Sequence, residues 1–458
     1  MDFSAAKVVV VGLGKSGVAA AGLLNRLGAR VVATDARDKE EIVALAPLRA
    51  EGIRIILGEH PLEILTHAAL VVVSPGVPRT IPFLQEARRR GIEVWSEVEL
   101  AYRLSPAPII AITGANGKTT TTAWLGEMLK AGGKRVMVAG NIGTPLTAVI
   151  EKVTAAHLLV VEVSSFQLES TREFRPHMAA LLNLTPDHLD RHGSFAAYAA
   201  AKGRIFANQD STDYCILNAD DEEVGKLGER LQGQVYPFSS RRELTQGAFI
   251  KDGSLVIRAG GKLHRLCSAG ELALPGGHNR ENALAAALMA YLSGVDPQVI
   301  AAVLKNFAGV AHRCETVAEI DGVRFVNDSK GTNPESTMRA LEAFGQPIIL
   351  IAGGRAKGSD FGQLAKAVKE RVKRVILLGE AAPLLQRALS AVGYRSVLPV
   401  ASLKDAVREA FSEAVPGDCI LLSPACASWD MFTSFEERGE VFKEAVAQLG
   451  GGTDEKKV

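Results

Sequence analysis

The chain is poor in cysteine and carries almost no net charge. Its five cysteines are scattered over 458 residues, and no two of them stand in a CxxC spacing. A disulfide framework or a structural zinc site is therefore not expected, and a reducing cytoplasmic setting fits. Because 52 basic residues nearly balance 51 acidic ones, the chain lacks the uncompensated positive charge of a general nucleic-acid binder.

Long apolar runs are also missing. The first run, at residues 7–11, is far too short for the apolar region of a signal peptide or for a membrane span. The other runs are no longer than a strand, so no membrane insertion is expected. At about 100–200 residues per domain, the length favours three domains, and the apolar content lets each bury a core.

Short runs of Val, Ile and Leu recur, and most are followed by Gly, Ser, Pro or Asn and then by a helical pattern. Continuous apolar runs predict strands buried on both faces, as in parallel sheets, and alternation with helices predicts an α/β fold. A hairpin is expected at 249–266, with turns at Asp252-Gly253 and Gly260-Gly261. The expected strands are 8–11, 70–73, 109–113, 158–163, 179–184, 347–352, 374–378 and 419–422.

The first glycine motif, GLGKSG at 12–17, follows an expected strand and opens an expected helix at 18–27. The next strand, 30–34, ends at Asp35. This arrangement is typical of dinucleotide-binding domains, in which glycines let the backbone approach a pyrophosphate at a helix N-terminus. The motif alone leaves open a dinucleotide, another nucleotide diphosphate of the UDP type, or a structural turn. Arg37 is either a phosphate contact or solvated, and the loop 74–76 is either a ligand loop or a plain turn.

The second glycine motif, GANGKTT at 114–120, lies between an expected strand and a helix at 121–130. Its ending is typical of P-loops, in which backbone N–H groups hold phosphates, a lysine (Lys118) neutralises them and a hydroxyl (Thr119) ligates Mg²⁺. A standard P-loop has glycine at position 112, where this chain has Ile112. The loop is therefore shorter, and ordinary GTPases and kinases fit less well. The alternative is a glycine-rich turn with a solvated lysine.

Acidic and imidazole side chains follow two further strands of the central region. Glu162 ends an apolar strand and suits Mg²⁺, which prefers one or two carboxylates together with substrate phosphates; the alternative is a carboxylate exposed to water. The loop TPDHLDRH at 185–192 holds two carboxylates, two imidazoles and a guanidinium. His188 is a candidate ligand of a metal or a phosphate, whereas His192 is expected to cap a helix or to face solvent.

Three central residues have no functional signal of their own. Lys202 lies in an Ala-rich helix at 195–206 and is interpreted as solvated. Asn141 is interpreted as a turn residue, and Asn279 as the N-cap of a helix at 283–292.

Charged and hydroxyl residues gather at expected strand ends in the last third. An arginine and several lysines on such loops suit an anionic substrate and the charge that develops in phosphoryl transfer. Together these loops predict a third α/β domain, although each alone is equally compatible with a surface loop. They are His312-Arg313, 327–333, 353–358 and 423–430.

The motifs now form an ordered set that resembles a known family, the Mur ligases of peptidoglycan precursor synthesis. The GLGKSG start and the SPACAS ending favour the branch of that family that adds D-glutamate. The motifs that carry the resemblance are TGANGKTT, GNIG, EVSSFQLE, LNLTPDHLDRH, GGHNRENA, HRCE, NDSKGTNPEST and SPACASWDMF, in this order over nearly the whole chain.

The resemblance implies three α/β domains. They are an N-terminal Rossmann-like domain for a UDP-linked substrate at 1–97, a central P-loop ATPase-type domain at 98–309 and a C-terminal Rossmann-like domain for the amino acid at 310–458. The implied activity is ATP-dependent formation of an amide bond between UDP-N-acetylmuramoyl-L-alanine and D-glutamate through an acyl phosphate. ATP and Mg²⁺ are the implied cofactors, the partners are small molecules, and a monomer is expected.

The resemblance also implies roles for individual residues. The catalytic residues are Lys118, Glu162, His188 and Lys202. The metal would be held by Thr119, Glu162, His188 and Lys202, the last as a carbamate. ATP would be bound by Gly114, Ala115, Asn116, Gly117, Lys118, Thr119, Thr120, Asn279, Arg313 and Asp328. The substrates would be bound by Lys15, Ser16, Asp35, Arg37, Gly76, Asn141, His188, Thr332, Lys357, Ser428 and Phe435.

Two positions depart from the family pattern. Ala36 stands where a hydroxyl residue is expected near the uracil, which leaves one hydrogen bond in doubt. Trp429 stands where a smaller apolar residue is expected, which would tighten the amino-acid pocket.

Rival functions remain at this point. A sibling ligase for another amino acid or a folylpolyglutamate synthase would share the phosphate loop. An NAD-dependent dehydrogenase would explain the first glycine motif but not the second. A non-catalytic nucleotide-binding regulator would predict that Lys118 is dispensable.

Overall fold

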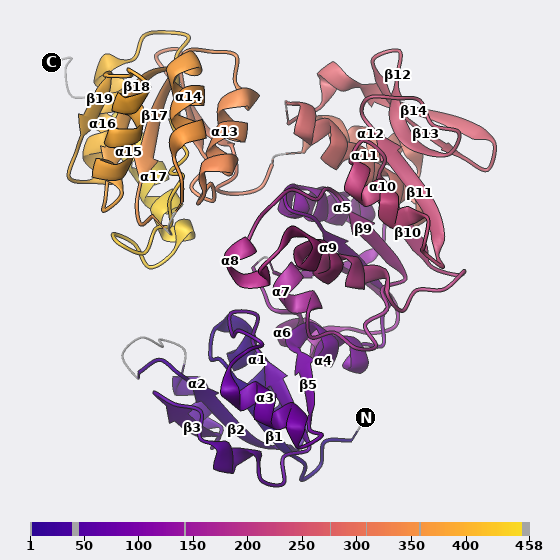
Figure 1. Ribbon diagram of the computed structural model, residues 1–458. Helices are drawn as coiled ribbons and strands as arrows, with labels where there is room; N and C mark the ends of the chain where they lie inside the picture. The colour runs from indigo at the N-terminus through magenta and orange to yellow at the C-terminus, as the bar shows by residue number, and fades with distance from the viewer. Residues whose placement is uncertain are drawn as a thin grey trace, which may run out of the picture. The chain divides into compact units, whose positions relative to one another are not determined.

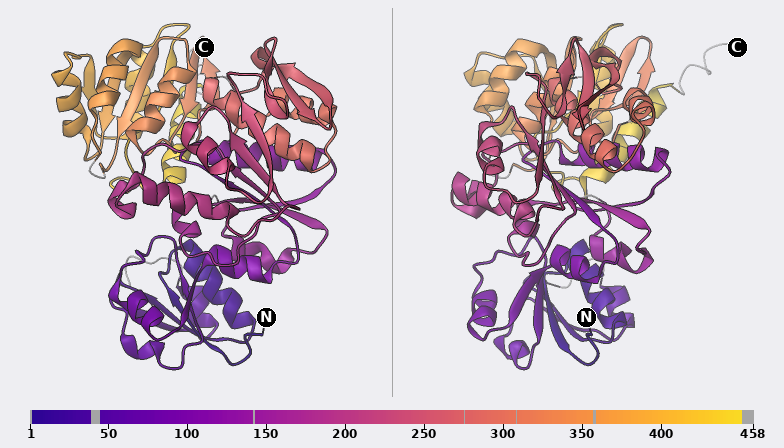
Figure 2. Two further views of the ribbon diagram at one scale, coloured as in Figure 1. Left: turned by 45° about the vertical axis from the view of Figure 1, so that its right-hand side comes forward. Right: turned by 90° about the vertical axis from the view of Figure 1, so that its right-hand side faces the viewer.

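The computed structural model describes residues 2–38, 45–141, 143–274, 276–307, 309–356 and 359–450. These residues form three sheets of five, nine and six strands (Figures 1 and 2). The chain divides into two compact units. One comprises residues 1–272 with 278–307 and holds the first two sheets, and the other comprises residues 273–277 with 308–458 and holds the third.

The first sheet is parallel, in the order β3-β2-β1-β4-β5. The chain changes its winding direction between β1 and β4, and ligands of such sheets bind at the carboxyl ends of these two strands. Valines 8–11 alternate between two separate core clusters, so the strand is buried on both faces as its sequence predicts. The elements are β1 (Lys7–Val11), α1 (Lys15–Arg26), β2 (Arg30–Asp35), α2 (Ala46–Ala50), β3 (Arg54–Leu57), η2 (Leu62–Leu65), β4 (Leu70–Val73), α3 (Pro82–Arg89), β5 (Glu93–Ser96) and α4 (Glu97–Leu104).

The second sheet has the order β14-β13-β12-β11-β10-β9-β6-β8-β7. All neighbouring strands from β12 to β7 in this order, β6 included, pair in parallel. Strands β12, β13 and β14 form antiparallel hairpins. The strands are β6 (Ile109–Thr113), β7 (Arg135–Gly140), β8 (His157–Glu162), β9 (Met178–Leu181), β10 (Tyr214–Asn218), β11 (Gln234–Ser239), β12 (Gly247–Lys251), β13 (Ser254–Ala259) and β14 (Lys262–Ser268). The helices are α5 (Lys118–Ala131), α6 (Leu146–Val149), η3 (Ile150–Lys152), α7 (Ser165–Leu168), α8 (Leu189–His192), α9 (Phe195–Gly203), η4 (Arg204–Phe206), α10 (Glu222–Gly228), η5 (Ala269–Glu271), α11 (Gly277–Leu292) and α12 (Pro297–Asn306).

The third sheet has the order β15-β16-β20-β17-β18-β19, with β15 antiparallel at one edge. Two core clusters lie on its opposite faces: one includes Leu341, Leu364 and Leu385, and the other includes Leu403 and Phe442. The elements are β15 (Glu315–Ile320), β16 (Val323–Asn327), α13 (Pro334–Ala343), β17 (Ile348–Gly353), α14 (Gly362–Arg371), β18 (Val372–Leu378), α15 (Ala382–Ala391), β19 (Val397–Pro399), α16 (Leu403–Glu413), β20 (Cys419–Leu422) and α17 (Phe435–Gly450).

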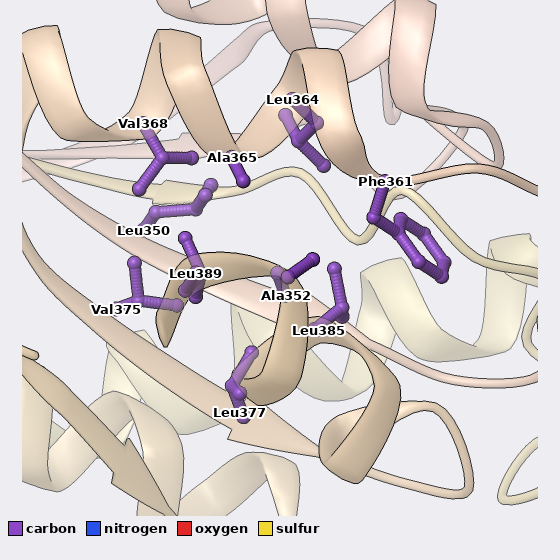
Figure 3. A pocket seen from close by; sticks show the side chains of 11 residues that line it. Leu350, Ala352, Phe361, Leu364, Ala365, Val368, Val375, Leu377, Leu385 and Leu389 are labelled. Carbon is purple, nitrogen blue, oxygen red and sulfur yellow. The ribbon is translucent and has the colours of Figure 1, made fainter. Parts of the chain in front are cut away.

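A small cavity lies between this sheet and helices α14 and α15 (Figure 3). Its volume is about 10 Å³, and every lining residue is apolar, among them Leu350, Leu364 and Leu389. A buried water needs two to four polar partners, so this cavity stays dry and belongs to the core.

The predicted α/β fold with parallel sheets is confirmed, and so is the hairpin, whose turns fall at 252–253 and 260–261. The main differences lie at element ends. Helix α1 begins three residues before the expected 18, and α5 begins three residues before the expected 121. Strand β9 ends at Leu181 rather than at residue 184, which releases the next residues into a loop. Among the helices of the described residues, none is long and apolar enough to cross a membrane.

Candidate active site

Two loops meet at the switch point of the first sheet. The Ser74 hydroxyl, after β4, donates to the Gly12 carbonyl oxygen at 2.7 Å. A Cβ atom on Gly17 would lie 1.8 Å from that same oxygen, so α1 can approach the loop only with glycine there. Gly12 itself has a φ of +88°, which favours glycine. The motif therefore builds an open helix N-terminus beside a second loop, as anion binding requires.

Asp35 ends β2 and organises this loop. Its Oδ2 accepts from the Leu13 backbone N–H at 2.6 Å, and its Oδ1 accepts from the Arg37 backbone N–H at 2.9 Å. The Arg37 side chain donates to both oxygens. Burial alone would raise the pKa of Asp35, but the hydrogen bonds from Arg37 and Leu13 outweigh it and lower that pKa to about 2. Asp35 is thus a fixed anion that orients Arg37.

The other residues predicted for this site lie at the same edge of the sheet. Lys15 and Ser16 open α1, and Gly76 lies in the loop after β4. Lys15, Ala36 and Gly76 are exposed, so their atoms are accessible to a ligand.

The phosphate loop connects β6 to α5. Gly117 has a φ of +82°, and a Cβ atom there would lie 2.2 Å from Asn282 Oδ1. Helix α5 begins at Lys118, which places Thr119 and Thr120 in its first turn. The Lys118 ammonium donates to the Gly114 and Ala115 carbonyl oxygens, each at 2.8 Å. The short loop therefore ends in a helix N-terminus next to a lysine, which is an anion site.

Two asparagines that the sequence analysis missed hold this loop. Asn183 accepts from the Ala115 and Asn116 backbone N–H groups, at 3.0 and 2.8 Å. Asn282 accepts from the Thr121 hydroxyl at 3.3 Å. Asn183 was hidden because the expected strand ran through it to residue 184; its only signal was a polar residue interrupting an apolar run.

Asn279 is not an N-cap. Helix α11 begins at Gly277, so Asn279 lies within its first turn. There it accepts a hydrogen bond from the Asn282 amide at 3.3 Å. The N-cap prediction was wrong because the expected helix started six residues late.

Glu162 is buried beside the phosphate loop. Its Oε2 accepts from the Thr119 hydroxyl at 3.0 Å, and its Oε1 accepts from the Asn141 amide at 2.8 Å. Only 2% of Glu162 is exposed, so the alternative of a solvated carboxylate is wrong, and Asn141 is more than a turn residue.

The donor set around Glu162 fits Mg²⁺. In the part of the chain that is described, no group of three or more His, Cys, Asp or Glu side chains is placed to hold a metal ion. Mg²⁺ does not need such a cage, because it is usually held by one or two carboxylates and the phosphates of a substrate. A buried carboxylate hydrogen-bonded to the P-loop hydroxyl matches that arrangement.

Lys202 is buried and lies against the same loop. Its ammonium donates to the Gly114 carbonyl oxygen at 2.7 Å and lies 4.8 Å from the centre of the Tyr198 ring. The side chain is 2% exposed, so the interpretation as a solvated lysine was wrong. Burial, and secondarily the positive charge of Lys118, holds the pKa of Lys202 well below its usual value. The neutral amine is therefore favoured over the ammonium here.

His188 and His192 differ in exposure. The side chain of His188 is half exposed, and its Nε2 lies 3.5 Å from Asp187 Oδ2. The side chain of His192 is 2% exposed, with ring nitrogens 3.0 Å from Ser165 Oγ and 3.0 Å from Glu169 Oε1. The expectation that His192 caps a helix or faces solvent was therefore wrong.

In the second unit, Asp328 follows β16 and is buried. It accepts from the Ser423 hydroxyl at 2.7 Å and from the Cys314 backbone N–H at 3.3 Å. Burial raises the pKa of Asp328 to about 6, against the lowering effects of Ser423 and Arg313. The predicted residues Arg313 and Asp328 thus influence each other electrostatically.

Arg438, which the sequence analysis missed, joins two loops of this unit. Its guanidinium is buried and donates to Ser329 Oγ at 3.0 Å, to the Ser329 carbonyl at 2.8 Å and to the Cys426 carbonyl at 3.2 Å. These loops carry Thr332 and Ser428. In the sequence Arg438 stands in a charged stretch, which by itself is typical of a surface position.

The residues predicted for the amino acid are spread over adjacent strand ends. Thr332 follows β16, and Ser428 follows β20 and is 2% exposed. Phe435 begins α17, and the Lys330 ammonium lies 5.4 Å from its ring centre. Trp429 is 58% exposed at this edge. Lys357 lies outside the described residues.

Three family profiles match the chain in order. They are described as "Mur ligase MurD-like, N-terminal domain" over residues 6–96, "Mur ligase middle domain" over 112–290 and "Mur ligase, glutamate ligase domain" over 312–426. Curated relatives named UDP-N-acetylmuramoylalanine–D-glutamate ligase are similar over their whole length. The protein of Pelotomaculum thermopropionicum is 48% identical, over 98% of this chain and 99% of the relative, and that of Bacillus mycoides is 46% identical with the same coverage.

Solved structures share the fold. A UDP-N-acetylmuramate–alanine ligase of Thermotoga maritima matches with a TM-score of 0.62 and 21% identity, over 97% of this chain and 99% of that one. A MurF ligase of the same organism, solved with ADP, matches with a TM-score of 0.59 and 17% identity, over 98% and 96% of the two chains.

Proposed function

The chain belongs to the Mur ligase family, and from this we propose that it joins D-glutamate to UDP-N-acetylmuramoyl-L-alanine at the expense of ATP. The relatives that share nearly half of its residues bear the name of that ligase. The observation that carries the proposal is the phosphate loop with its two lysines, Lys118 and Lys202, and the buried Glu162. This set suits the activation of a carboxylate by ATP and has no use in a hydride-transfer enzyme.

The UDP-linked substrate belongs to the first domain, ATP to the second with two residues of the third, and the amino acid to the third, with domain boundaries at 97/98 and 309/310. The loops at Lys15–Ser16 and Gly76, with Arg37 held by Asp35, bind the uridine diphosphate. The phosphate loop, residues 114–120, binds ATP together with Asn279, Arg313 and Asp328. The amino acid is bound by Thr332, Lys357, Ser428 and Phe435.

The reaction has two steps. The substrate carboxylate attacks the γ-phosphorus of ATP, so that a C–O–P bond forms, the bond to the β–γ bridging oxygen breaks and ADP leaves. The amine of D-glutamate then attacks the acyl carbon, and the tetrahedral intermediate expels phosphate as the amine loses a proton. Lys118 offsets the repulsion between the carboxylate and the triphosphate. Asn141 and His188 orient the muramoyl-alanine end of the substrate.

Thr119, Glu162, His188 and a carbamate on Lys202 would hold Mg²⁺. The metal neutralises phosphate charge when bound. The buried Lys202 supports the carbamate, because a neutral amine reacts with CO₂ to form an N–C bond and releases a proton to solvent, and the resulting anion would be attracted to Lys118 rather than repelled by it. The setting is a cytoplasmic one in peptidoglycan precursor synthesis, with the enzyme acting as a monomer.

The direct test is a ligation assay with UDP-N-acetylmuramoyl-L-alanine, ATP and a panel of amino acids, in which phosphate release and the coupled product are both measured. D-glutamate is expected to be the preferred acceptor. Lys118→Ala is expected to lower kcat by at least about 100-fold, the loss typical of removing one charge-stabilising donor. Lys130→Ala, an exposed lysine on the same helix α5, is the control and keeps full activity.

Preference for another amino acid would mean that the chain is a ligase of the same family that adds that amino acid. Full ligation by Lys118→Ala would contradict the assignment of the phosphate loop.

A further inference from the structure

Two side chains of α8 and the side chain of its N-cap residue, His188, converge on one ring of α7. The centre of the Phe166 ring lies 4.8 Å from that of His188 and 5.3 Å from that of His192, which is stacked on it at 16°. The Arg191 guanidinium carbon lies 4.1 Å from the same centre. A helix of four residues has no stability of its own, so these contacts hold α8 in place.

His192 is the most constrained member of this cluster. One ring nitrogen, Nε2, lies 3.0 Å from Ser165 Oγ, and the other, Nδ1, lies 3.0 Å from Glu169 Oε1. The ring also packs edge-on against Tyr198, at 5.4 Å. Rotation of the imidazole would leave buried polar groups without hydrogen-bond partners, so the ring is held in one orientation.

The order Ser165–His192–Glu169 is that of a nucleophilic triad, but the serine is not placed for attack. Ser165 is 2% exposed, and a nucleophile must reach its substrate. The three residues therefore hold α8 against α7 and do not react.

Two hydrogen bonds extend this cluster to the loop that follows β4. Arg191 donates to the Val77 carbonyl oxygen at 3.0 Å, and Arg79 donates to the Glu169 carbonyl oxygen at 2.6 Å. Val77 directly follows Gly76, which is assigned above to the uridine diphosphate. The same short helix thus contacts the loop after β4 through Arg191 and has His188 as its N-cap residue.

We propose that His192 is a positioning residue for the ligase reaction. By fixing the Phe166 ring and α8, it holds His188 in place for the phosphates and Mg²⁺ and joins His188 to the loop of the UDP-linked substrate. The inference rests on the proposed function, because the role of His188 is assigned there. The side chain of His192 touches neither substrate nor metal; it acts through Phe166 and α8.

The test compares His192→Ala with Ser165→Ala, which removes one of the two hydrogen bonds while keeping the imidazole. Groups that orient a metal ligand typically change metal affinity or activity by about 10–100-fold. For His192→Ala we expect kcat to fall within that range, while KM for D-glutamate stays within about twofold. Binding of Mn²⁺ in place of Mg²⁺, followed by electron paramagnetic resonance with an ATP analogue and the UDP-linked substrate, is expected to weaken by about tenfold.

A double-mutant cycle tests whether Ser165 and His192 act through the same hydrogen bond. The pair Ser165→Ala with His192→Ala is expected to be no worse than His192→Ala alone, because both changes remove the same hydrogen bond. His177→Ala is the control, since His177 is exposed and lies just before β9, at the opposite end of the strand. It leaves kcat and Mn²⁺ affinity unchanged.

If His192→Ala and Ser165→Ala lower only the melting temperature and keep the kcat and Mn²⁺ affinity of the parent protein, the positioning role is overturned. If His192→Ala does not fold, Ser165→Ala decides alone. Absence of D-glutamate ligation in the parent protein would instead refute the proposed function, so the two failures are distinct.

Discussion

Asp328 is the single residue whose environment most clearly sets a pH dependence. Burial raises its pKa from 3.8 to about 6, so the fold favours the neutral acid. The neutral Asp328 carboxyl therefore contributes to the stability of the folded state. This contribution is complete below the ordinary pKa of the carboxyl and is lost as the pH rises through about 6. A pKa shift of about two units corresponds to about 3 kcal/mol of folding free energy.

Asp328→Asn is therefore expected to stabilise the protein more at pH 8 than at pH 4.5, because the amide stays neutral at both. The measurement is the melting temperature at the two pH values. Glu342→Gln, at an exposed position on α13, is the control and changes neither value by more than a degree or so. An equal effect of Asp328→Asn at both pH values would mean that the carboxyl does not titrate as its burial implies. Ligation is expected to fall in the same variant, because Asp328 is proposed to bind ATP.

Individual residues also show where prediction from sequence stops. The motifs predicted Lys118, Thr119 and Glu162 because their spacing reports local geometry. Lys202 was interpreted as solvated because a lysine in an Ala-rich helix usually is, and His192 was expected to cap a helix or to face solvent. Their burial results from packing against segments far away in the sequence, such as Gly114 and Ser165, which no local pattern encodes.

At the scale of elements, the turn between β1 and α1 contains glycines with two different roles. A Cβ atom on Gly17 would collide with the Gly12 carbonyl, whereas one on Gly14 would meet nothing within 4 Å. Gly17 is thus needed by the fold, and Gly14 leaves room where a diphosphate is proposed to bind.

Gly17→Ala is expected to destabilise the protein by about 1–3 kcal/mol, as overpacking does. Gly14→Ala is expected to keep the melting temperature and to raise KM for the UDP-linked substrate by about tenfold or more, at unchanged KM for ATP, equivalent to about 1.4 kcal/mol of lost binding. Gly225→Ala in α10, which also has free space around it, serves as the control. An unchanged KM for the UDP-linked substrate in Gly14→Ala would mean that the diphosphate does not bind at this turn.

The strands were predictable because continuous apolar runs have few other uses. The helix starts were less so: α1, α5 and α11 each begin earlier than expected. Glycine-rich loops contain too few apolar positions for a helical period to be detected, so the first turn of the helix is not predicted from the sequence. That turn is the one proposed to bind phosphates, and the expected boundaries left it out of the helix.

At the scale of the whole molecule, the chain consists of two compact units. We propose that the C-terminal domain, residues 310–458, closes over bound ATP when the UDP-linked substrate is present, which excludes water from the acyl phosphate. The sequence predicted the three sheets, but side-chain bonds that join the first two, such as Arg26 with Glu151 at 2.7 Å, depend on tertiary structure.

Closure is expected to lower the radius of gyration measured by small-angle scattering with a non-hydrolysable ATP analogue and the UDP-linked substrate. The same ligands are expected to shift the fluorescence of Trp429, which is 58% exposed, whereas Trp95 and Trp124 are buried. Trp429→Phe removes the fluorescence change but not the compaction. Scattering curves that stay the same with and without ligands would contradict closure.

The buried thiols have a practical consequence. All five cysteines are free, and four of them are buried. Burial raises the pKa of Cys215 and Cys267 to about 11 and that of Cys419 and Cys426 to about 12, and it also raises that of Cys314. Since the thiolate is the reactive form, the native chain is a poor target for maleimides at neutral pH. Two cysteines introduced on the surface, one in each unit, can therefore carry a pair of dyes without removal of the native thiols, and energy transfer between them would follow the two units during turnover.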